Sequence, residues 1–345
     1  MDLPDDQKER TPEGSHKSQI QRFGEARNKT CELLEFIYQN LDQYDRNLRA
    51  NLRKEYAKVK NCGNYLLYHH YYTIDEYRLI AGIMCQNKWL DALCGLRWAD
   101  KAVQKYYEKY KQVLEQYPEY QNYITCMITL TVKNRERLTE AYTDLDKALK
   151  RVSSTIRNSR SGRTSSEFGK IKGMVGSIEV KKGKGGKWHP HFHAFVILDD
   201  YIDKQTMTEE WYYKTDKVSF ITDIRESNGD VLSFCEVLSY TLKVSTLLPQ
   251  ERIEAWWKLS GKQMIRTWGI FRKVKLPEQL TDDPIENLPY TKILYRYVYK
   301  EGYTLEYFKK MEQSEIDYQK EMDRQDRIVK SLLKVNAPDL QTDET

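Results

Sequence analysis

The sequence lacks any hydrophobic run long enough to cross a membrane, because no stretch of about 18 apolar residues occurs in its 345 residues. Its first ten residues, MDLPDDQKER, also lack the apolar core of a secretory signal peptide. We therefore predict a soluble, cytoplasmic protein without a membrane partner. With 31% charged residues and a mean hydropathy of −0.77 the chain is polar, but it is long enough to bury a core in two domains.

A strong net charge is missing as well. Fifty-six basic residues against 51 acidic ones leave only +5. This balance is a weak overall signal for nucleic-acid binding, so any DNA-binding surface has to come from local clusters of cations.

The six cysteines include no C-x-x-C pair. In an intracellular chain we expect them to remain thiols rather than to form disulfides. Cys62, Cys85 and Cys94 are candidates for a zinc site, with His69 or His70 as a further ligand. Their spacing does not match a standard zinc ribbon, so a loose zinc site and a set of buried thiols both stay open.

The most informative segment runs from Gly176 to Leu198, with the sequence GSIEVKKGKGGKWHPHFHAFVIL. It predicts two strands joined by a basic, glycine-rich turn. In the second strand the period of two places His191 and His193 on one face, and Phe192, Ala194 and Val196 on the other.

Two imidazoles on one strand face form half of a divalent metal site, because they are about 6–7 Å apart and can converge on one ion. Glu179, on the polar face of the neighbouring strand, is the preferred third ligand, and His189 is the alternative. Two histidines and a carboxylate leave positions open for substrate oxygens, and we expect Mn²⁺ or Mg²⁺. An isolated His-x-His triplet is equally typical of an ordinary half-exposed strand, so a second motif is needed.

That motif is FCEVLSYTLKVST at residues 234–246, in a helix predicted over Val231–Leu247. Glu236, Tyr240 and Lys243 stand at positions i, i+4 and i+7, which share one helix face. Tyrosine is a poor nucleophile at neutral pH because its pKa is near ~10. Beside a metal site, Tyr240 can attack a phosphodiester while Lys243 stabilises the developing charge.

Three motifs in this order resemble the HUH endonucleases, and within them the rolling-circle plasmid replication initiators. They are ITLTVKN at Ile128–Asn134, HPHFHAF at His189–Phe195 and EVLSYTLK at Glu236–Lys243, the last with the Glu-x-x-x-Tyr-x-x-Lys spacing of one branch. A looser resemblance extends from Cys62 to about Lys273.

The resemblance implies a role for each motif residue. Tyr240 would nick the origin and become joined to the 5′ end, and Glu236 would activate or position water for the terminating cleavage. Lys243 would assist electrostatically, and His191 and His193 would be metal ligands. The implied partners are plasmid origin DNA, single-stranded or extruded as a cruciform, and a host helicase and polymerase.

Two basic segments, Arg151–Lys172 and Lys181–Lys187, predict a phosphate-binding surface around the metal hairpin. The scissile strand must be single-stranded or extruded to reach Tyr240. Trp188 either stacks on a base or packs the turn. The predicted DNA-binding residues are Arg157, Arg160, Arg163, Lys181, Lys182, Lys184, Lys187 and Trp188.

The predicted fold is α+β, with a central antiparallel sheet that carries the metal site, flanking helices and helical extensions at both ends. We expect a disordered N-terminus over residues 1–16, a helical and hairpin accessory region over 17–118, and the endonuclease domain over 119–276. Residues 277–345 are expected to form an acidic linker and a charged helix over Tyr303–Val335.

The predicted function is site-specific nicking and strand transfer at a plasmid origin, which leaves a free 3′-OH primer. A transposase or a conjugative relaxase is the nearest alternative, because it uses the same chemistry on another substrate. A DNA-binding regulator with a structural metal would not cleave, and a metallohydrolase of small phosphoesters would need no tyrosine.

Overall fold

The computed structural model describes residues 12–183, 185–239, 244–286 and 288–309. The chain divides into two compact units, one formed by the residues up to Arg97 together with those from Gln279 on, the other by Trp98–Glu278. Each unit contains one antiparallel sheet with helices, which confirms the α+β class. Among the helices of the described residues, none combines the length and apolarity needed to cross a membrane.

The unit Trp98–Glu278 is built on a five-stranded antiparallel sheet in the order β6-β3-β5-β4-β7. The predicted hairpin forms its centre, since β4 and β5 pair along most of their length around the glycine-rich turn. The strands are β3 (Ile124–Thr131), β4 (Ile171–Lys182), β5 (Trp188–Leu198), β6 (Thr222–Glu226) and β7 (Ile265–Gly269).

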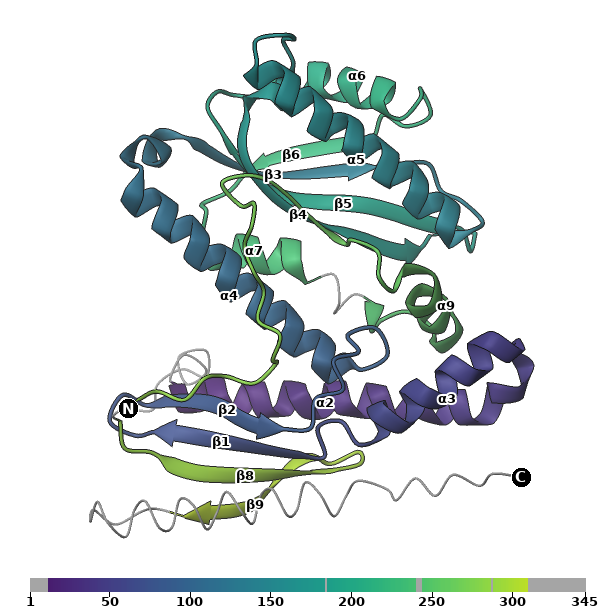
Figure 1. The fold of residues 1–345 in the computed structure, drawn as a ribbon, viewed down its shortest axis with the longest axis vertical. Coiled ribbons are helices and arrows are strands. Elements are labelled where there is room, and N and C mark those ends of the chain that lie inside the picture. Colours follow the sequence, from purple (N-terminus) through teal and green to yellow (C-terminus); the bar gives the residue numbers. More distant parts are fainter. Residues whose placement is uncertain (1–11, 184, 240–243, 287, 310–345) are drawn as a thin grey trace, which may run out of the picture. The chain divides into compact units, whose positions relative to one another are not determined.

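One face of this sheet is covered by α5 (Leu138–Arg160), as Figure 1 shows. Apolar side chains recur along α5 at helical spacing and are buried, among them Leu145, Leu149 and Val152. Because α5 continues to Arg160, the first part of the basic segment Arg151–Lys172 is helical.

The opposite face carries the histidines at one end and an aromatic cluster over the rest. The cover here consists of α7 (Val231–Leu238) and the later turns of α4 (Ala92–Gln116) (Figure 1). Phe195 of β5 packs against Phe234 of α7 and Tyr110 of α4, with ring centroids 4.6 and 5.4 Å away. The polar cluster with the histidines lies at the end of this sheet face near the β4–β5 turn.

Shorter elements complete the unit around the sheet. Among its described residues it also contains the helices η2 (Pro118–Asn122), η3 (Glu167–Lys170), α6 (Lys204–Lys214) and α9 (Pro249–Leu259).

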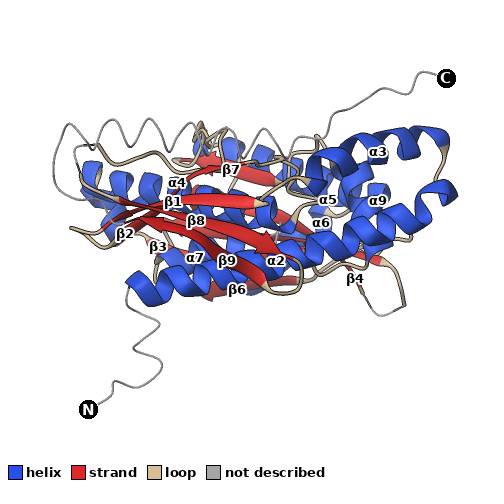
Figure 2. Cartoon of the chain, turned by 90° about the horizontal axis from the view of Figure 1, so that it is seen from below, coloured by secondary structure: helices blue, strands red, loops and turns tan. Residues whose placement is uncertain are grey.

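The other unit contains a second sheet, in the order β2-β1-β8-β9, which we did not predict. β1 (Tyr65–Tyr71) and β2 (Glu76–Gly82) form the predicted hairpin, and β8 (Thr291–Val298) and β9 (Gly302–Lys309) join it from the far end of the sequence (Figure 2). The helices in the described part of this unit are α2 (Pro12–Asn40), η1 (Leu41–Gln43), α3 (Arg46–Lys60) and the first turns of α4.

Three expected boundaries differ from the structure. Residues 12–16 belong to α2 rather than to a disordered terminus, and His16 is buried because it packs among the tyrosines of the second sheet. Residues 303–309 form β9 and not the start of a helix, because they pair with β8. The unit with the predicted metal site begins at Trp98 and not at residue 119. The rest of the predicted C-terminal helix lies outside the described residues.

Candidate metal centre and nicking site

Glu179, His191 and His193 converge on the polar end of the sheet. In the β4–β5 register Glu179 lies opposite His191. Nε2 of His191 is 3.4 Å from one Glu179 oxygen, and Nε2 of His193 is 3.3 Å from the other. One ligand atom from each residue lies within 4.8 Å of the other two. Glu179 and His191 are buried, whereas His193 is partly exposed and opens the site to solvent.

The donor set could hold a divalent metal ion. Nδ1 of His193 lies 3.0 Å from the hydroxyl oxygen of Thr129 on β3. A proton on Nδ1 that is donated to Thr129 leaves Nε2 with its lone pair directed at the cluster. Two imidazole nitrogens and one carboxylate bind such an ion and leave coordination positions for substrate oxygens.

Burial lowers the pKa of His191, although Glu179 opposes this by favouring the protonated ring. The lowered pKa favours the neutral imidazole, which keeps a lone pair for a metal. Burial also lowers the pKa of His189, and the nearby Lys181 adds to the shift.

His189, the alternative third ligand, is placed differently. Its Nδ1 contacts the side-chain oxygen of Asn134, and its ring centroid is 5.2 Å from that of His191. Its ring nitrogens do not belong to the group of ligand atoms around Glu179. Among the described residues, the structure brings Glu179 rather than His189 to both histidines.

The helix with the third motif docks beside this cluster. The hydroxyl of Ser177 on β4 donates a hydrogen bond to the main-chain carbonyl of Val237 in the last turn of α7. Ser177 stands two residues before Glu179 and opposite His193 in the register. α7 begins at the predicted Val231, where Asp230 caps it by accepting a hydrogen bond from the Ser233 amide at 3.0 Å.

Glu236 is exposed on α7 and forms an ion pair with Arg225 of β6. Sequence reasoning missed Arg225 and the docking role of Ser177. The alternation of β4 places Ser177 on the same face as Glu179, but only the packing of α7 shows what it contacts. Tyr240 and Lys243 lie outside the described residues.

Of the predicted DNA-binding residues, two exposed lysines lie near the metal end of the hairpin. Lys181 is the penultimate residue of β4, and Lys187, just before β5, forms an ion pair with Glu136 at 3.0 Å. Trp188 is fully buried, and the Lys182 ammonium lies 4.9 Å from its ring centroid. Because Trp188 has no exposed face for a base, it packs the turn. Lys184 lies outside the described residues.

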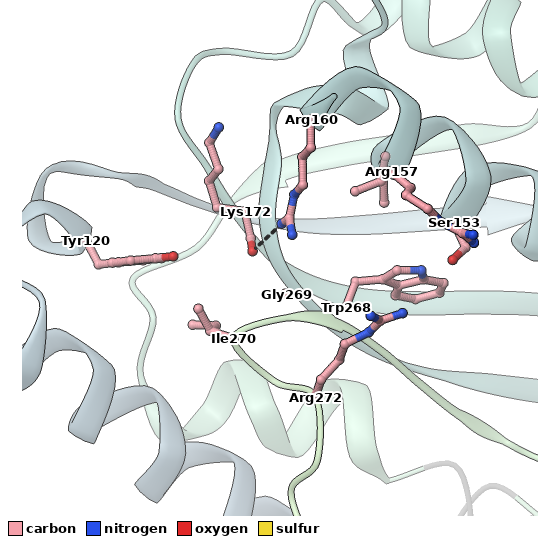
Figure 3. A pocket seen from close by; sticks show the side chains of 10 residues that line it. Tyr120, Ser153, Arg157, Arg160, Lys172, Trp268, Gly269, Ile270 and Arg272 are labelled. Carbon is pink, nitrogen blue, oxygen red and sulfur yellow. Dashed lines mark hydrogen bonds between the residues drawn. The ribbon is translucent and has the colours of Figure 1, made fainter. Parts of the chain in front are cut away.

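The predicted arginines lie away from the metal end of the sheet. Arg157 and Arg160 line a pocket of about 570 Å³ with Lys172, Trp268 and Arg272 (Figure 3). Lys172 is near the start of β4, seven residues before Glu179, which corresponds to about 23 Å along a strand. The arginines are therefore not gathered around the metal hairpin as expected. Arg163 is exposed and does not line this pocket.

The pocket is lined by cationic as well as aromatic side chains. The Arg160 guanidinium donates to the main-chain carbonyls of Ile171 and Lys172, at 3.1 and 2.7 Å. Among the described residues, Arg157 and Arg272 have no ion-pair partner, so both guanidinium groups are available to an anion.

A family model described as a replication protein matches residues 76–292. The matched range includes the metal cluster, the pocket and α7 with Glu236. A search among curated proteins found no match. A search among solved structures found none either. Because the matched range covers more than half of the chain, the chain belongs to the replication protein family.

Proposed function

We propose that the protein is a plasmid replication initiator that nicks one strand of origin DNA through Tyr240. The observation that carries this proposal is the convergence of Glu179, His191 and His193 next to the docked end of α7. A bound Mn²⁺ or Mg²⁺ would polarise the scissile phosphate there and lower the cost of its negative charge. In the reaction the Tyr240 oxygen forms a bond to phosphorus while the bond to the 3′ oxygen breaks. The 5′ phosphate stays joined to Tyr240, and the 3′ oxygen takes up a proton to become the primer hydroxyl.

The link between α7 and the strand supports Tyr240 as the nucleophile. Tyr240 follows Val237 by three residues, and three residues span at most about 11 Å. The Val237 carbonyl accepts a hydrogen bond from Ser177, so this short tether starts beside the metal cluster. Lys243 follows Tyr240 by three residues in the sequence and is proposed to stabilise the phenolate or the phosphate.

Glu236 is proposed to serve the terminating cleavage, in which water replaces tyrosine as the nucleophile. Its carboxylate is exposed and so accessible to water. Its ion pair with Arg225 joins two half-exposed side chains, and such pairs contribute about 1 kcal/mol or less. Glu236 can therefore leave Arg225 when a substrate is present.

The DNA is proposed to contact both cationic regions of this unit. Lys181, Lys182 and Lys187 would lie near the scissile phosphate, and Lys184 stands between them in the sequence. The pocket of Arg157, Arg160 and Arg272 would hold a phosphate further along the DNA, and Arg163 a neighbouring one. About 23 Å corresponds to roughly seven nucleotides of one duplex strand. The single strand at the nick is then flanked by bound DNA, and a host helicase and polymerase would extend the 3′ end.

The test is the covalent adduct. We expect the full chain, with Mn²⁺ and single-stranded origin DNA, to give a DNA-linked product that denaturing gels resolve and peptide mass assigns to Tyr240. Tyr240→Phe should abolish the adduct and leave DNA binding intact, while Tyr201→Phe, an exposed tyrosine on a loop, is the matched control. The adduct should also disappear after chelation and in His191→Ala.

The outcomes separate the alternatives. Metal and DNA binding without an adduct on any origin DNA would replace the nickase with a metal-stabilised DNA-binding regulator. An adduct that forms equally on transposon ends or transfer origins would point to a transposase or relaxase with the same chemistry.

A further inference from the structure

A second group of metal-binding side chains lies in the unit that contains β1 and β2, apart from the proposed nicking chemistry. Cys62 follows α3, Cys85 follows β2, and Asp91 and Cys94 stand at the start of α4. One ligand atom from each of the four lies within 4.8 Å of the other three. Three separate elements thus bring their ends to one point.

The sulfur separations are close to those around a metal ion. Sγ of Cys94 is 3.4 Å from Sγ of Cys62 and 3.6 Å from Sγ of Cys85. In a tetrahedral zinc site with Zn–S bonds of about 2.3 Å, two sulfur atoms are about 3.8 Å apart. A disulfide would need about 2.05 Å and would leave one thiol and the aspartate unused.

Asp91 provides an independent sign that the cluster binds a cation. Its side chain is fully buried. One oxygen accepts a hydrogen bond from the Cys94 amide at 2.8 Å and so caps α4. The other oxygen has no hydrogen-bond partner among the described residues, and the Arg27 guanidinium lies 3.8 Å from it. A buried carboxylate oxygen without a hydrogen bond is costly, and a cation in the cluster would partner it.

The surroundings suit three thiolates and a carboxylate around a divalent ion. Such a set carries four negative charges, of which zinc would balance two, and buried Arg27 lies close enough to balance another. Arg27 is held in place by the main-chain carbonyls of Val59 and Lys60, at 3.1 and 2.6 Å. The amide of Cys85 donates to Sγ of Cys62 at 3.4 Å, which stabilises negative charge on that sulfur.

The two histidines considered from the sequence do not take part. His69 stacks on Tyr290 with ring centroids 3.7 Å apart, and Nε2 of His70 lies 2.8 Å from a side-chain oxygen of Asp75. The prediction of His69 or His70 as the further ligand is wrong, because the two side chains lie on β1 and face its sheet neighbours. The fourth group is Asp91.

We propose that Cys62, Cys85, Asp91 and Cys94 bind one zinc ion, which ties the ends of α3 and β2 to the start of α4. Soft thiolates favour zinc over the hard ions expected at the histidine site. Four protein ligands, three of them fully buried, leave no position for a substrate, so the site is structural. Zinc binding would then stabilise this unit by favouring the folded chain.

The first experiment uses the full chain purified from zinc-containing medium. We expect about one tightly bound zinc per chain by mass spectrometry of the metal, released when a mercurial reagent blocks the thiols. Exchange with Co²⁺ should give the thiolate-to-cobalt charge-transfer absorption of a tetrahedral site. The absorption should fall by about one third in Cys85→Ser, because two of three thiolates remain.

Two variants and two controls assign the metal to this cluster. Asp91→Asn keeps a helix-capping side chain but removes the charge, and should lower zinc affinity by at least about 100-fold. The double variant Cys62→Ser/Cys94→Ser should contain no zinc. Cys31→Ser, in the same unit, and the double variant His191→Ala/His193→Ala should keep the zinc and the cobalt spectrum.

The proposal is overturned if the wild-type chain retains no zinc and gives no charge-transfer absorption with Co²⁺. It is also overturned if zinc persists without Cys62 and Cys94, or disappears with His191 and His193. Because the wild-type spectrum decides the first point, a cysteine variant that fails to fold does not stop the test. Loss of nicking in Tyr240→Phe would not affect the outcome.

Discussion

The hydroxyl of Ser177 donates a hydrogen bond to the main-chain carbonyl of Val237, and this bond joins the strand of Glu179 to the last turn of α7. Both groups are buried against the aromatic cluster that covers this sheet face. The bond adds to the packing of Phe234 on Phe195 in holding the last turn of α7 against the sheet.

Replacing Ser177 by alanine removes this bond and leaves the Val237 carbonyl without its partner. We expect a loss of about 1–3 kcal/mol in unfolding free energy and a larger relative loss in the single-turnover nicking rate, since the nucleophile segment loses its anchor. Urea unfolding and rapid-quench cleavage measure the two effects. Ser154→Ala, on the exposed side of α5, is the control. Nicking that slows no more than in this control would refute the anchoring role.

Thr129→Val tests how the metal site is oriented. Valine keeps the shape of threonine but cannot accept a hydrogen bond from the N–H group at Nδ1 of His193. The imidazole ring therefore loses its fixed orientation. We expect Mn²⁺ affinity to fall by about 10–100-fold in calorimetric titration. Thr125→Val on the same strand removes a hydrogen bond to the Ser227 carbonyl, away from the site, and should leave Mn²⁺ affinity unchanged. Equal affinities for both variants would contradict a supporting role for Thr129.

Arg157→Ala and Arg272→Ala test the pocket in Figure 3 as a phosphate site. Each change should weaken binding of origin DNA and reduce the slope of log affinity against log salt by about 1, because one phosphate contact is lost. Lys150→Ala, on the same helix but ion-paired with Asp146, is the control. A slope that stays at the wild-type value in the double arginine variant would exclude this pocket from the DNA path.

Because His16 is buried, we predict that the unit with β1 and β2 becomes less stable in acid. Burial, helped by His70, lowers the pKa of His16 from 6.5 to about 4. Above pH 6.5 the ring is neutral in both the folded and the unfolded chain, so it adds no pH dependence to the folding stability. As the pH falls from 6.5 to about 4, the unfolded chain takes up the proton first, and folding stability decreases by about 3 kcal/mol.

His16→Phe should remove most of this dependence, because phenylalanine can keep the stacking on Tyr77, whose ring centroid is 3.9 Å away, and cannot be protonated. We expect the stability lost between pH 7 and pH 4.5 to be about 2 kcal/mol smaller than in the wild type. Urea unfolding at a series of pH values measures the difference. Parallel curves for the two proteins would show that His16 is not the responsible group.

Local patterns in the sequence predicted the parts of the site that depend on neighbouring residues. The strand period placed His191 and His193 on one face, and the glycine-rich turn predicted the hairpin that brings Glu179 opposite them. The start of α7 at Val231 was also predicted. These features follow from the strand period of two residues or the helix period of three to four residues. A short segment of sequence shows such a period by itself.

Tertiary structure alone decided the relationships between distant segments. Arg157 and Glu179 are 22 positions apart, yet β4 is long enough to separate the pocket from the metal cluster. Strand β8, at residues 291–298, pairs with β1 of the hairpin formed by residues 65–82, and Asp91 rather than His69 or His70 joins the cysteines. The energies that select these contacts come from burial and pairing between segments far apart in the chain, and no local pattern encodes which segments meet.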